Sequence, residues 1–592
     1  MSKLKVTARW GAAWLVYLSL CAPLVPAQTQ KRSPLQPARP APSGPRVVAN
    51  GDTPPPTVAP SAVVTALKTE LQRAQEVLGK KGDPPPYYIG YQVTDSDVSV
   101  VSASFGALRG SNGIRQRLLD VEVRVGNYDF DNSRPLRGEG AGGYVGAVAL
   151  PLEDDLDALK SAIWLRTDAR YREAVEHLSR AQTNRAVTVK QENPAADFSR
   201  EQASNALYAP VKLTADSKAW AGRVKEVSQV FSAYPDLLSA EVTYQQEATT
   251  KYLVNTEGST LQYGSTAARL VITASTKADD GMELFRYEVF DARISDGLPT
   301  VDTLRQIAEK VAKDVVALKK APVVEPFTGP AILSGRAAGV FFHEIFGHRI
   351  EGHRQKNEEE GNTFTKQVGQ PILPRFISVY DDPTLAKLGN IDLGGYYLFD
   401  DEGVKSQRVP VVENGILRNF LLSRSPLPNF PLSNGHGRRS PGFAPVGRQG
   451  NLMVQSNITV PKAKLRQMLI AEARRQKKPF GLYFEDVSGG FTFTGRGTPQ
   501  AFQITPIMVY RVYTDGRPDE LVRGVDLIGT PLTAFSKIIA ASDQPEVFNG
   551  ICGAESGWVP VSAISPALLL QQMEVQKKPK SSELRPILPA PQ

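Results

Sequence analysis

The sequence predicts an α+β fold in which a domain of helices on a sheet precedes a domain rich in strands. The chain has 592 residues, enough for two or three domains, and its composition, 41% hydrophobic and 22% charged, is that of a globular protein. Helical periodicity is strong in several segments before residue 322, whereas most later segments have the residue types of strands. Because the two kinds of segment do not alternate regularly, α+β is favoured over a doubly wound sheet.

The first residues have the pattern of a secretory signal peptide. Lys3, Lys5 and Arg9 precede an uncharged apolar run at 11–25, and Ala27 offers a small-residue cleavage site. An uncleaved membrane anchor is the alternative, although the run is short for a bilayer span. Cleavage would remove three positive charges from the net +8 and leave +5, too weak a bias to favour a nucleic acid partner. We therefore expect export to the periplasm or the cell exterior, with no stable membrane span after cleavage.

The remaining chain divides into four expected parts. Residues 28–60 are rich in proline and poor in core-forming residues, which predicts a flexible leader. Residues 61–322 form the expected α+β domain and 323–575 the β-rich domain, and prolines around residue 322 interrupt the pattern between them. Residues 576–592 are expected to be a disordered tail.

The N-terminal domain should begin with a helix, because apolar residues recur at intervals of three and four from Ser61 to Leu78. Strands and further helices follow. We expect strands at 88–101, 118–125, 251–261, 269–274 and 284–289, and helices at 154–183 and 304–316.

In the β-rich domain, expected to be barrel-like or sandwich-like, one short helix carries the main functional clue. Ser334 is a reasonable N-cap for it, and small residues between Gly335 and Gly339 allow close packing against a neighbour. The other expected elements are strands at 376–380, 408–422, 481–487, 502–513 and 520–525, and a helix at 463–474.

Two of the five histidines in the chain, His343 and His348, flank Glu344 at the end of this short helix. Two imidazoles beside a carboxylate are typical of zinc hydrolases. The spacing is HExxxH rather than HExxH, which places the histidines roughly 140° apart on a regular helix. Both could bind one metal only if a π-type bulge or an early helix end distorts the backbone between them. Gly347, immediately before His348, permits such a departure at low steric cost.

Three protein ligands and a water molecule would make a catalytic zinc site, in which the pKa of the water falls to about 7. Glu344 points between the two imidazole directions on an ideal helix and could accept a proton from that water as the general base. The residues alone leave the third ligand open. The candidates are Cys552, in what we expect to be a glycine-bracketed turn, and His353, His436, Glu351 and the aspartates.

Several further residues are candidates for substrate contact or for support of the ligands. Glu351 could play either part, or could be a solvated carboxylate paired with Arg349 or Arg354. His353 and His436 are each favoured as local structural histidines over substrate contacts. The full set of such candidates is Gly347, Glu351, His353, His436 and Arg438.

The pattern His343-Glu344-x-x-Gly347-His348-x-x-Glu351-Gly352 resembles the TldD/PmbA family of metallopeptidases, in particular its catalytic TldD-type branch. Three more segments are similar to that family and stand in its order. They begin at Asn434 (Asn-Gly-His-Gly-Arg), Gly529 (Gly-Thr-Pro-Leu-Thr-Ala-Phe) and Cys552 (Cys-Gly-x-x-x-Gly). Together the motifs cover about residues 330–575.

The resemblance implies a zinc-dependent peptidase with His343, His348 and Cys552 as ligands and Glu344 as base. It also implies an α+β domain before a β-rich domain, and a homodimer or a heterodimer with a related subunit. The implied substrates are unfolded or extended peptides, held as an added strand along an exposed sheet edge. The signal peptide is a departure, because the best known members of the family are cytoplasmic.

The leading hypothesis is therefore an exported zinc peptidase. The first alternative is a catalytically silent peptide-binding subunit of the same fold, which the intact His-Glu-His motif disfavours. The second is a zinc amidohydrolase that acts on small molecules or cell-wall peptides, and no residue excludes it.

Overall fold

The computed structural model describes residues 56–136, 143–187, 195–356, 360–496, 501–578 and 588. The expected signal peptide at 1–27, most of the leader at 28–60 and most of the tail at 576–592 lie outside the described residues, so those expectations stay predictions. No described helix is long and apolar enough to cross a membrane.

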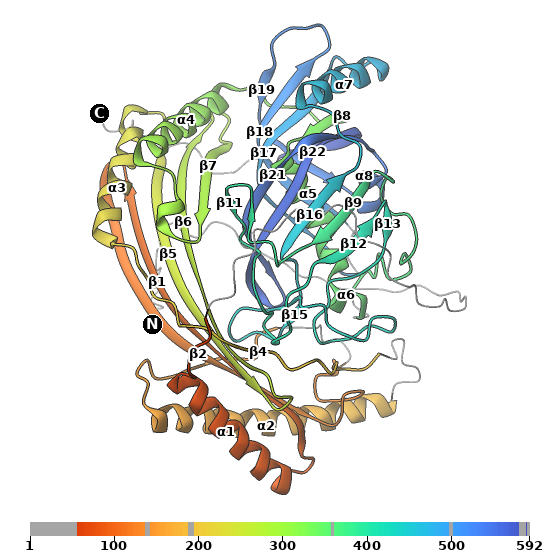
Figure 1. Cartoon of the computed structure of the whole chain (residues 1–592). Helices are drawn as coiled ribbons and strands as arrows, with labels where there is room; N and C mark the ends of the chain where they lie inside the picture. The colour runs from red at the N-terminus through yellow and green to blue at the C-terminus, as the bar shows by residue number, and fades with distance from the viewer. Residues whose placement is uncertain are drawn as a thin grey trace, which may run out of the picture.

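The N-terminal part of the chain is one curved seven-stranded sheet with helices along its outer side (Figure 1). The strand order is β3-β2-β1-β5-β6-β4, and β7 pairs with β6. The strands are β1 (Pro86–Ser104), β2 (Ala107–Val125), β3 (Val148–Ala149), β4 (Asn205–Leu207), β5 (Ser239–Asn255), β6 (Thr260–Lys277) and β7 (Glu283–Ala292). The helices are α1 (Ala62–Lys81), α2 (Leu156–Val187), α3 (Ser217–Gln229) and α4 (Val301–Lys320).

Two hydrophobic cores hold these helices to the sheet. One joins α1 and α2 to β1, β2 and β5, and the other joins α3 and α4 to β1, β5 and β6. Ser61 and Thr300 cap α1 and α4, because each side chain accepts a hydrogen bond from the backbone N–H three residues later. The expected helices at 61–78 and 304–316 are thus present with slightly wider bounds.

The strands expected at 88–101 and 118–125 are present, but each is part of a longer strand, because β1 spans 86–104 and β2 also includes residues 107–117. Other expectations for this part were wrong. The strand expected at 251–261 crosses the turn at 256–259 that separates β5 from β6. Helix α3 was not anticipated.

The C-terminal part contains an eleven-stranded sheet. Its strands are β8 (Phe327–Leu333), β9 (Ile377–Asp381), β12 (Val409–Glu413), β13 (Ile416–Leu417), β16 (Asn451–Ser456), β17 (Phe480–Thr492), β18 (Phe502–Tyr513), β19 (Glu520–Val522), β20 (Val525–Gly529), β21 (Ile538–Ala554) and β22 (Gly557–Lys577). Two small pairs, β10 (Lys387–Leu388) with β11 (Ile391–Asp392) and β14 (Gly437–Arg438) with β15 (Val446–Gly447), lie outside it, and the helices are α5 (Gly335–Ile345), α6 (Gly352–Lys356), α7 (Lys462–Arg475) and α8 (Pro531–Phe535).

The long strand β22 closes this sheet into a barrel. It pairs with β20 and also with β8, and β20, β18, β17 and β8 are hydrogen-bonded in that order. The prediction of a β-rich domain after an α+β domain is confirmed, and the closure is that of a barrel rather than of a sandwich. Strands β21 and β22 were not anticipated, and β22 runs past the expected domain end at 575 to Lys577. The strand expected at 408–422 is the short hairpin of β12 and β13.

Helix α5 packs against β22, β17 and β21 (Figure 1). The Ser334 side chain accepts from the backbone N–H of Ala337 and caps the helix as expected. A Cβ on Gly335 would lie 2.5 Å from the carbonyl oxygen of Ser565, and one on Gly339 would lie 2.9 Å from that of Ala563. The small residues therefore let this helix approach the backbone of β22, and place its C-terminal end beside the β21–β22 hairpin.

Candidate metal centre

The helix that carries His343 ends before His348. Helix α5 stops at Ile345, and after Phe346 the four residues Gly347–Ile350 form a 3-10 turn. The change is visible in the hydrogen bonds: Phe346 N–H donates to the carbonyl of Phe342, four residues back, whereas Arg349 N–H donates to that of Phe346, three residues back. An early helix end, rather than a π-type bulge, is therefore how the chain accommodates the five-residue spacing.

Gly347 is required here for a different reason than expected. Its φ is not in the left-handed region. A Cβ at this position would lie 1.9 Å from Oε1 of Gln449, a buried side chain that packs against the turn. The missing side chain therefore makes room for Gln449, whose Nε2 donates to the carbonyl of His343.

The turn brings both histidines to one sulfur. His343 Nε2 lies 3.2 Å and His348 Nε2 3.4 Å from Sγ of Cys552. The two imidazole planes are 81° apart, and all three side chains are buried. Cys552 lies in strand β21, two residues before its end, and not in a turn as the sequence suggested. Three donors from two separate segments thus face one point.

This donor set fits a zinc ion. Zinc bonds of roughly 2.1 Å to nitrogen and 2.3 Å to sulfur at tetrahedral angles place ligand atoms about 3.5 Å apart, close to the separations found here. With both imidazoles neutral, as ligands must be, the negative groups at the cluster outnumber the positive groups by two. The five anions are Cys552 as a thiolate, Glu344, Glu351, Glu360 and Glu555, and the three cations are Arg349, Arg354 and Arg448. A divalent cation would balance that excess.

Glu344 stands next to the donors without joining them. Its Oε2 is 3.9 Å from Nε2 of His348, and only 7% of the residue is exposed. Burial raises the pKa of Glu344, and the nearby imidazoles offset this only in part. The side chain lies against Gly490 of β17, where a Cβ would approach Cγ of Glu344 to 2.8 Å. A carboxylate in this position can exchange a proton with a group held at the donors.

The pKa values of two of the donors, His348 and Cys552, are strongly shifted. Burial alone would lower the pKa of His348, but the attraction of Cys552 and Glu351 outweighs it and raises that pKa well above its usual range. Burial would raise the pKa of Cys552, but His348 and Arg448 outweigh it and lower that pKa far below the ordinary value for a thiol. The pKa values of His348 and Cys552 are therefore shifted in opposite directions, and each shift is caused in large part by the other side chain.

Glu351 is fully buried and supports a donor. Its Oε2 lies 3.2 Å from Nδ1 of His348 and accepts from Nε of Arg354 at 2.9 Å. Burial would raise the pKa of Glu351, but His348 and Arg354 outweigh it and lower it to about 2. Glu351 is therefore not solvated, although it is paired with Arg354 as the alternative from the sequence expected. The contact with Nδ1 leaves Nε2 of His348 pointing at the sulfur.

The remaining candidates lie outside the cluster of donors. His353 is buried with its Nε2 3.5 Å from Glu555, in a second group formed with Glu351, and Arg354 already bridges the two carboxylates there. His436 is fully buried between Asp381, 3.2 Å from its Nε2, and the carbonyl of Asn434. Arg438 donates to the carbonyl of Gln449 at 2.6 Å. The last two have structural partners and do not reach the donors.

Sequence reasoning missed Arg448, which donates to the sulfur of Cys552. It considered Arg354 as a partner of Glu351, three residues away, but missed that Arg354 also joins Glu351 to Glu555. Neither the Arg448 contact nor the Glu555 contact has a local spacing that would mark it, because both are made through the fold. Gly490, which lies against Glu344, was also missed.

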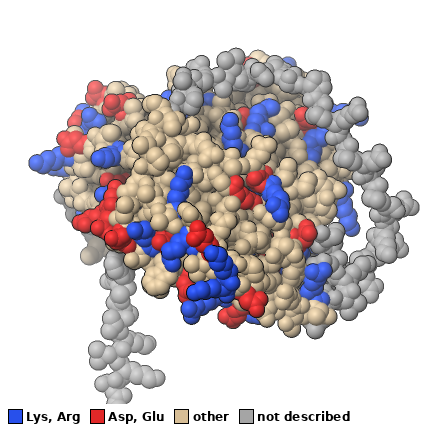
Figure 2. All heavy atoms as spheres, turned by 60° about the horizontal axis from the view of Figure 1, so that its bottom comes forward, with Lys and Arg blue, Asp and Glu red and all other residues tan. Residues whose placement is uncertain are grey.

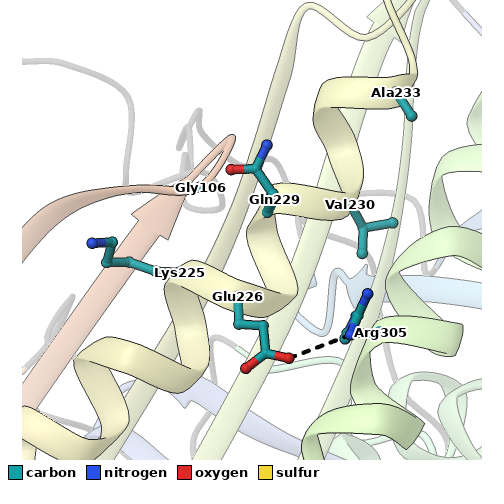
Figure 3. A pocket seen from close by; sticks show the side chains of 7 residues that line it. All are labelled: Gly106, Lys225, Glu226, Gln229, Val230, Ala233 and Arg305. Carbon is teal, nitrogen blue, oxygen red and sulfur yellow. Dashed lines mark hydrogen bonds and ion pairs between the residues drawn. The ribbon is translucent and has the colours of Figure 1, made fainter.

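A hollow of about 480 Å³ lies elsewhere, between the β1–β2 turn and helices α3 and α4 (Figure 3). Glu226 and Arg305 form an ion pair of 3.4 Å across it. Its lining, which comes from the N-terminal part alone, is Gly106, Lys225, Glu226, Gln229, Val230, Ala233 and Arg305. It shares no residue with the cluster of donors and holds no comparable set of reactive groups.

Charged side chains of both signs lie next to one another over the described part of the surface in Figure 2. That face offers no broad area of a single sign among the described residues. Such a mixed surface does not favour a polyanionic partner.

The fold and the donors define a class: an α+β protein whose β-rich part holds a His–His–Cys cluster, able to bind a metal ion, beside a carboxylate. Residues 327–577 match the family model of the PmbA/TldA metallopeptidase C-terminal domain. Residues 327–577 therefore carry a domain of the PmbA/TldA metallopeptidase family, and the family predicted from the motifs at about 330–575 is confirmed for this part of the chain.

Curated relatives are similar to this chain in sequence, and a solved structure shares its fold. A metalloprotease of Methanothermobacter thermautotrophicus is 25% identical over 57% of this chain and 70% of that protein. A zinc metalloprotease TldD homolog of Saccharolobus solfataricus is 22% identical over 59% of this chain and 74% of that protein. The chain spans only about half the length of several other curated relatives, between 47% and 51%. TldE of Thermococcus kodakarensis shares the fold, with a TM-score of 0.57 at 12% identity over 86% of this chain and 100% of that one.

Proposed function

We propose that the chain is an exported zinc-dependent peptidase that hydrolyses extended or unfolded peptides, with Glu344 as general base. The observation that carries the proposal is the convergence of His343, His348 and Cys552 on one point, with the Glu344 carboxylate beside it. The names of metalloprotease relatives support the same class of reaction. Export, and a homodimer or a heterodimer with a related subunit, are parts of the proposal that rest on the sequence.

Each residue at the centre has a distinct role in this proposal. Zinc held by the two imidazoles and the thiolate would act as a Lewis acid and lower the pKa of a water molecule to about 7. Glu344 would take a proton from the attacking water and pass it to the leaving amine. The burial that raises the pKa of Glu344 brings it closer to that of the groups with which it exchanges protons. Arg349 donates to the carbonyl of Glu344 at 3.3 Å and fixes the backbone there.

An open strand edge beside Glu344 supports an extended peptide as the substrate. Strand β17 pairs with β18 along its length but with β8 only from Leu482 to Phe484, so no other described strand covers its second edge at 489–492. The open stretch ends there, because Gly361 N–H donates to the carbonyl of Thr494 just beyond the strand. Phe493 N–H donates to the carbonyl of Ala501 in the direction of β18. Antiparallel alternation then turns the N–H and C=O groups of Gly490 and Thr492 toward the open edge. A peptide strand added there would run past Glu344 and be held mainly through its backbone.

The test of this proposal is hydrolysis of an unstructured peptide by the purified chain, followed by mass spectrometry. We expect about one zinc ion per chain, cleavage that falls to background after a chelator removes the metal, and recovery on addition of zinc. Stoichiometric zinc and peptide binding without cleavage under any metal would instead identify the silent peptide-binding subunit. Cleavage confined to small amides or cell-wall peptides would identify the amidohydrolase.

Replacing Gly490 by alanine tests the place of Glu344 beside the open edge. The new Cβ would lie 2.8 Å both from Cγ of Glu344 and from the carbonyl oxygen of Gln503, so the carboxylate or the strand must shift. We expect kcat to fall about tenfold or more with zinc content unchanged, since small misplacements of a catalytic group are costly. The matched control is Gly113→Ala in β2, where the Cβ meets nothing nearer than 3.8 Å. Equal activity of both variants would show that Glu344 does not need this position.

A further inference from the structure

Arg448 is not one of the donors, but it contacts Cys552 directly and His348 through Glu351. Its side chain is fully buried. Nη2 lies 3.1 Å from Sγ of Cys552 and also donates to the carbonyl oxygen of Cys552 at 2.8 Å. Nε forms an ion pair of 3.4 Å with Oε1 of Glu351, whose other oxygen contacts His348. One guanidinium therefore touches the thiolate directly and the second imidazole through a single carboxylate.

The backbone of Arg448 is held by contacts that do not involve the donors. The residue follows β15, and its N–H donates to the carbonyl of His436 at 2.9 Å. The preceding glycine, Gly447, lies so close to the chain at Leu421 that a Cβ would approach that carbonyl oxygen to 2.3 Å. The guanidinium is thus presented from a rigid segment that belongs to neither ligand-bearing element.

A buried guanidinium is costly unless its charge is matched. The guanidinium of Arg448 is matched by the Cys552 thiolate, which is itself a donor, and by the Glu351 carboxylate, which contacts the donor His348. A hydrogen bond to a metal-binding sulfur withdraws electron density from it, and a carboxylate behind a histidine fixes the direction of its ring. The planar fork of arginine can reach both groups together, which a single ammonium cannot.

We propose that Arg448 is a positioning residue of the metal centre, which sets the direction of Cys552 and His348 and the donor strength of the sulfur. The inference rests on the metal centre of the proposed function but not on peptide cleavage. A purely structural role is the competing explanation, because Nη1 of Arg448 also holds the β21–β22 turn through Ser556 Oγ at 2.9 Å and the carbonyl of Gly557.

Metal binding separates the two explanations. We expect Arg448→Met to weaken zinc binding by about 10- to 100-fold in competition with a chromogenic chelator, the range for residues that support ligands. In the cobalt-substituted protein, the sulfur-to-metal charge-transfer band should shift, because its energy depends on the electron density of the sulfur. Arg448→Lys keeps the charge but not the fork and should give a smaller change in the same direction. It is the deciding variant if Arg448→Met does not fold.

Two matched variants serve as controls. Ser556→Ala removes a contact of Arg448 with the turn and leaves the sulfur contact, so zinc affinity and the cobalt band should stay at wild-type values. Arg424→Met removes another buried arginine, which pairs with Glu257 of the N-terminal part. This variant should lower the stability of the protein but leave zinc affinity and the cobalt band unchanged. Wild-type affinity and band in a folded Arg448 variant, or an equal loss in Ser556→Ala, would overturn the inference. A wild-type chain that binds neither zinc nor cobalt would overturn the proposed metal centre itself.

Discussion

Replacement of Glu344 by glutamine is expected to leave zinc binding intact and to reduce peptide hydrolysis by about 10²- to 10⁴-fold, the usual contribution of a general base. Glutamine has nearly the same shape as glutamate, and Glu344 lies beside the donors without being one. The amide cannot accept the proton from water. Zinc per chain by elemental analysis and kcat/KM on one unstructured peptide are the two measurements.

The control is Glu70→Gln, which changes a buried carboxylate of α1 that pairs with Arg73, far along the chain from the donors. It should hydrolyse the peptide at the wild-type rate. If Glu344→Gln kept full activity with zinc bound, another group would have to accept the proton. If it lost zinc as well, Glu344 would be a ligand or a structural support rather than a base.

Local sequence patterns were enough to place His343, Glu344 and His348 at the end of a short helix. The reason is that all the information is contained within a few turns: a serine cap, small residues that permit close packing, and a spacing that a regular helix cannot accommodate. Helix α4 was similarly clear, because its apolar residues form one stripe.

The strands that deliver Cys552 could not be predicted in this way. Pro545 lies within β21, and Pro560 and Pro566 lie within β22, and proline argues against a strand because it has no N–H to donate. In the fold, Pro545 lies opposite Pro566 just after an irregularity in the register, where a ladder tolerates such residues. Residues 107–117 escaped detection for another reason: they form an exposed strand without an alternating buried face.

The surroundings of the donors depend on contacts between residues far apart in the chain. Arg448 meets Cys552 across 104 positions, and Arg354 meets Glu555 across 201. No periodicity connects such pairs, and an arginine in a glycine-rich segment is by itself unremarkable. The spacing of the histidines predicted a distorted helix, by either a π-type bulge or an early end, and the structure shows the early end at Ile345. The packing of Gln449 against Gly347 follows only from the closed barrel.

Replacement of Cys552 by serine should have the largest effect on metal binding. Serine lacks the soft, readily ionised sulfur that both imidazoles face, and its hydroxyl does not ionise at neutral pH. We expect zinc affinity to fall by at least about 100-fold, more than for residues that only support ligands. Dialysis against a weak chelator should then leave the variant with little zinc, and peptide hydrolysis should be lost in parallel.

Two further variants separate loss of a donor from loss of packing. Cys552→Asp restores an anionic donor of similar size, so zinc affinity should fall between that of the wild type and that of Cys552→Ser. Val559 lies opposite Cys552 on β22 and packs with it, so Val559→Ala opens a gap beside the thiol and removes no donor. It should lower the melting temperature and keep zinc, because the sulfur and both imidazoles remain. Wild-type zinc content and affinity in Cys552→Ser would exclude the thiol as a ligand, and the two histidines would then need another partner among the buried carboxylates around Glu351.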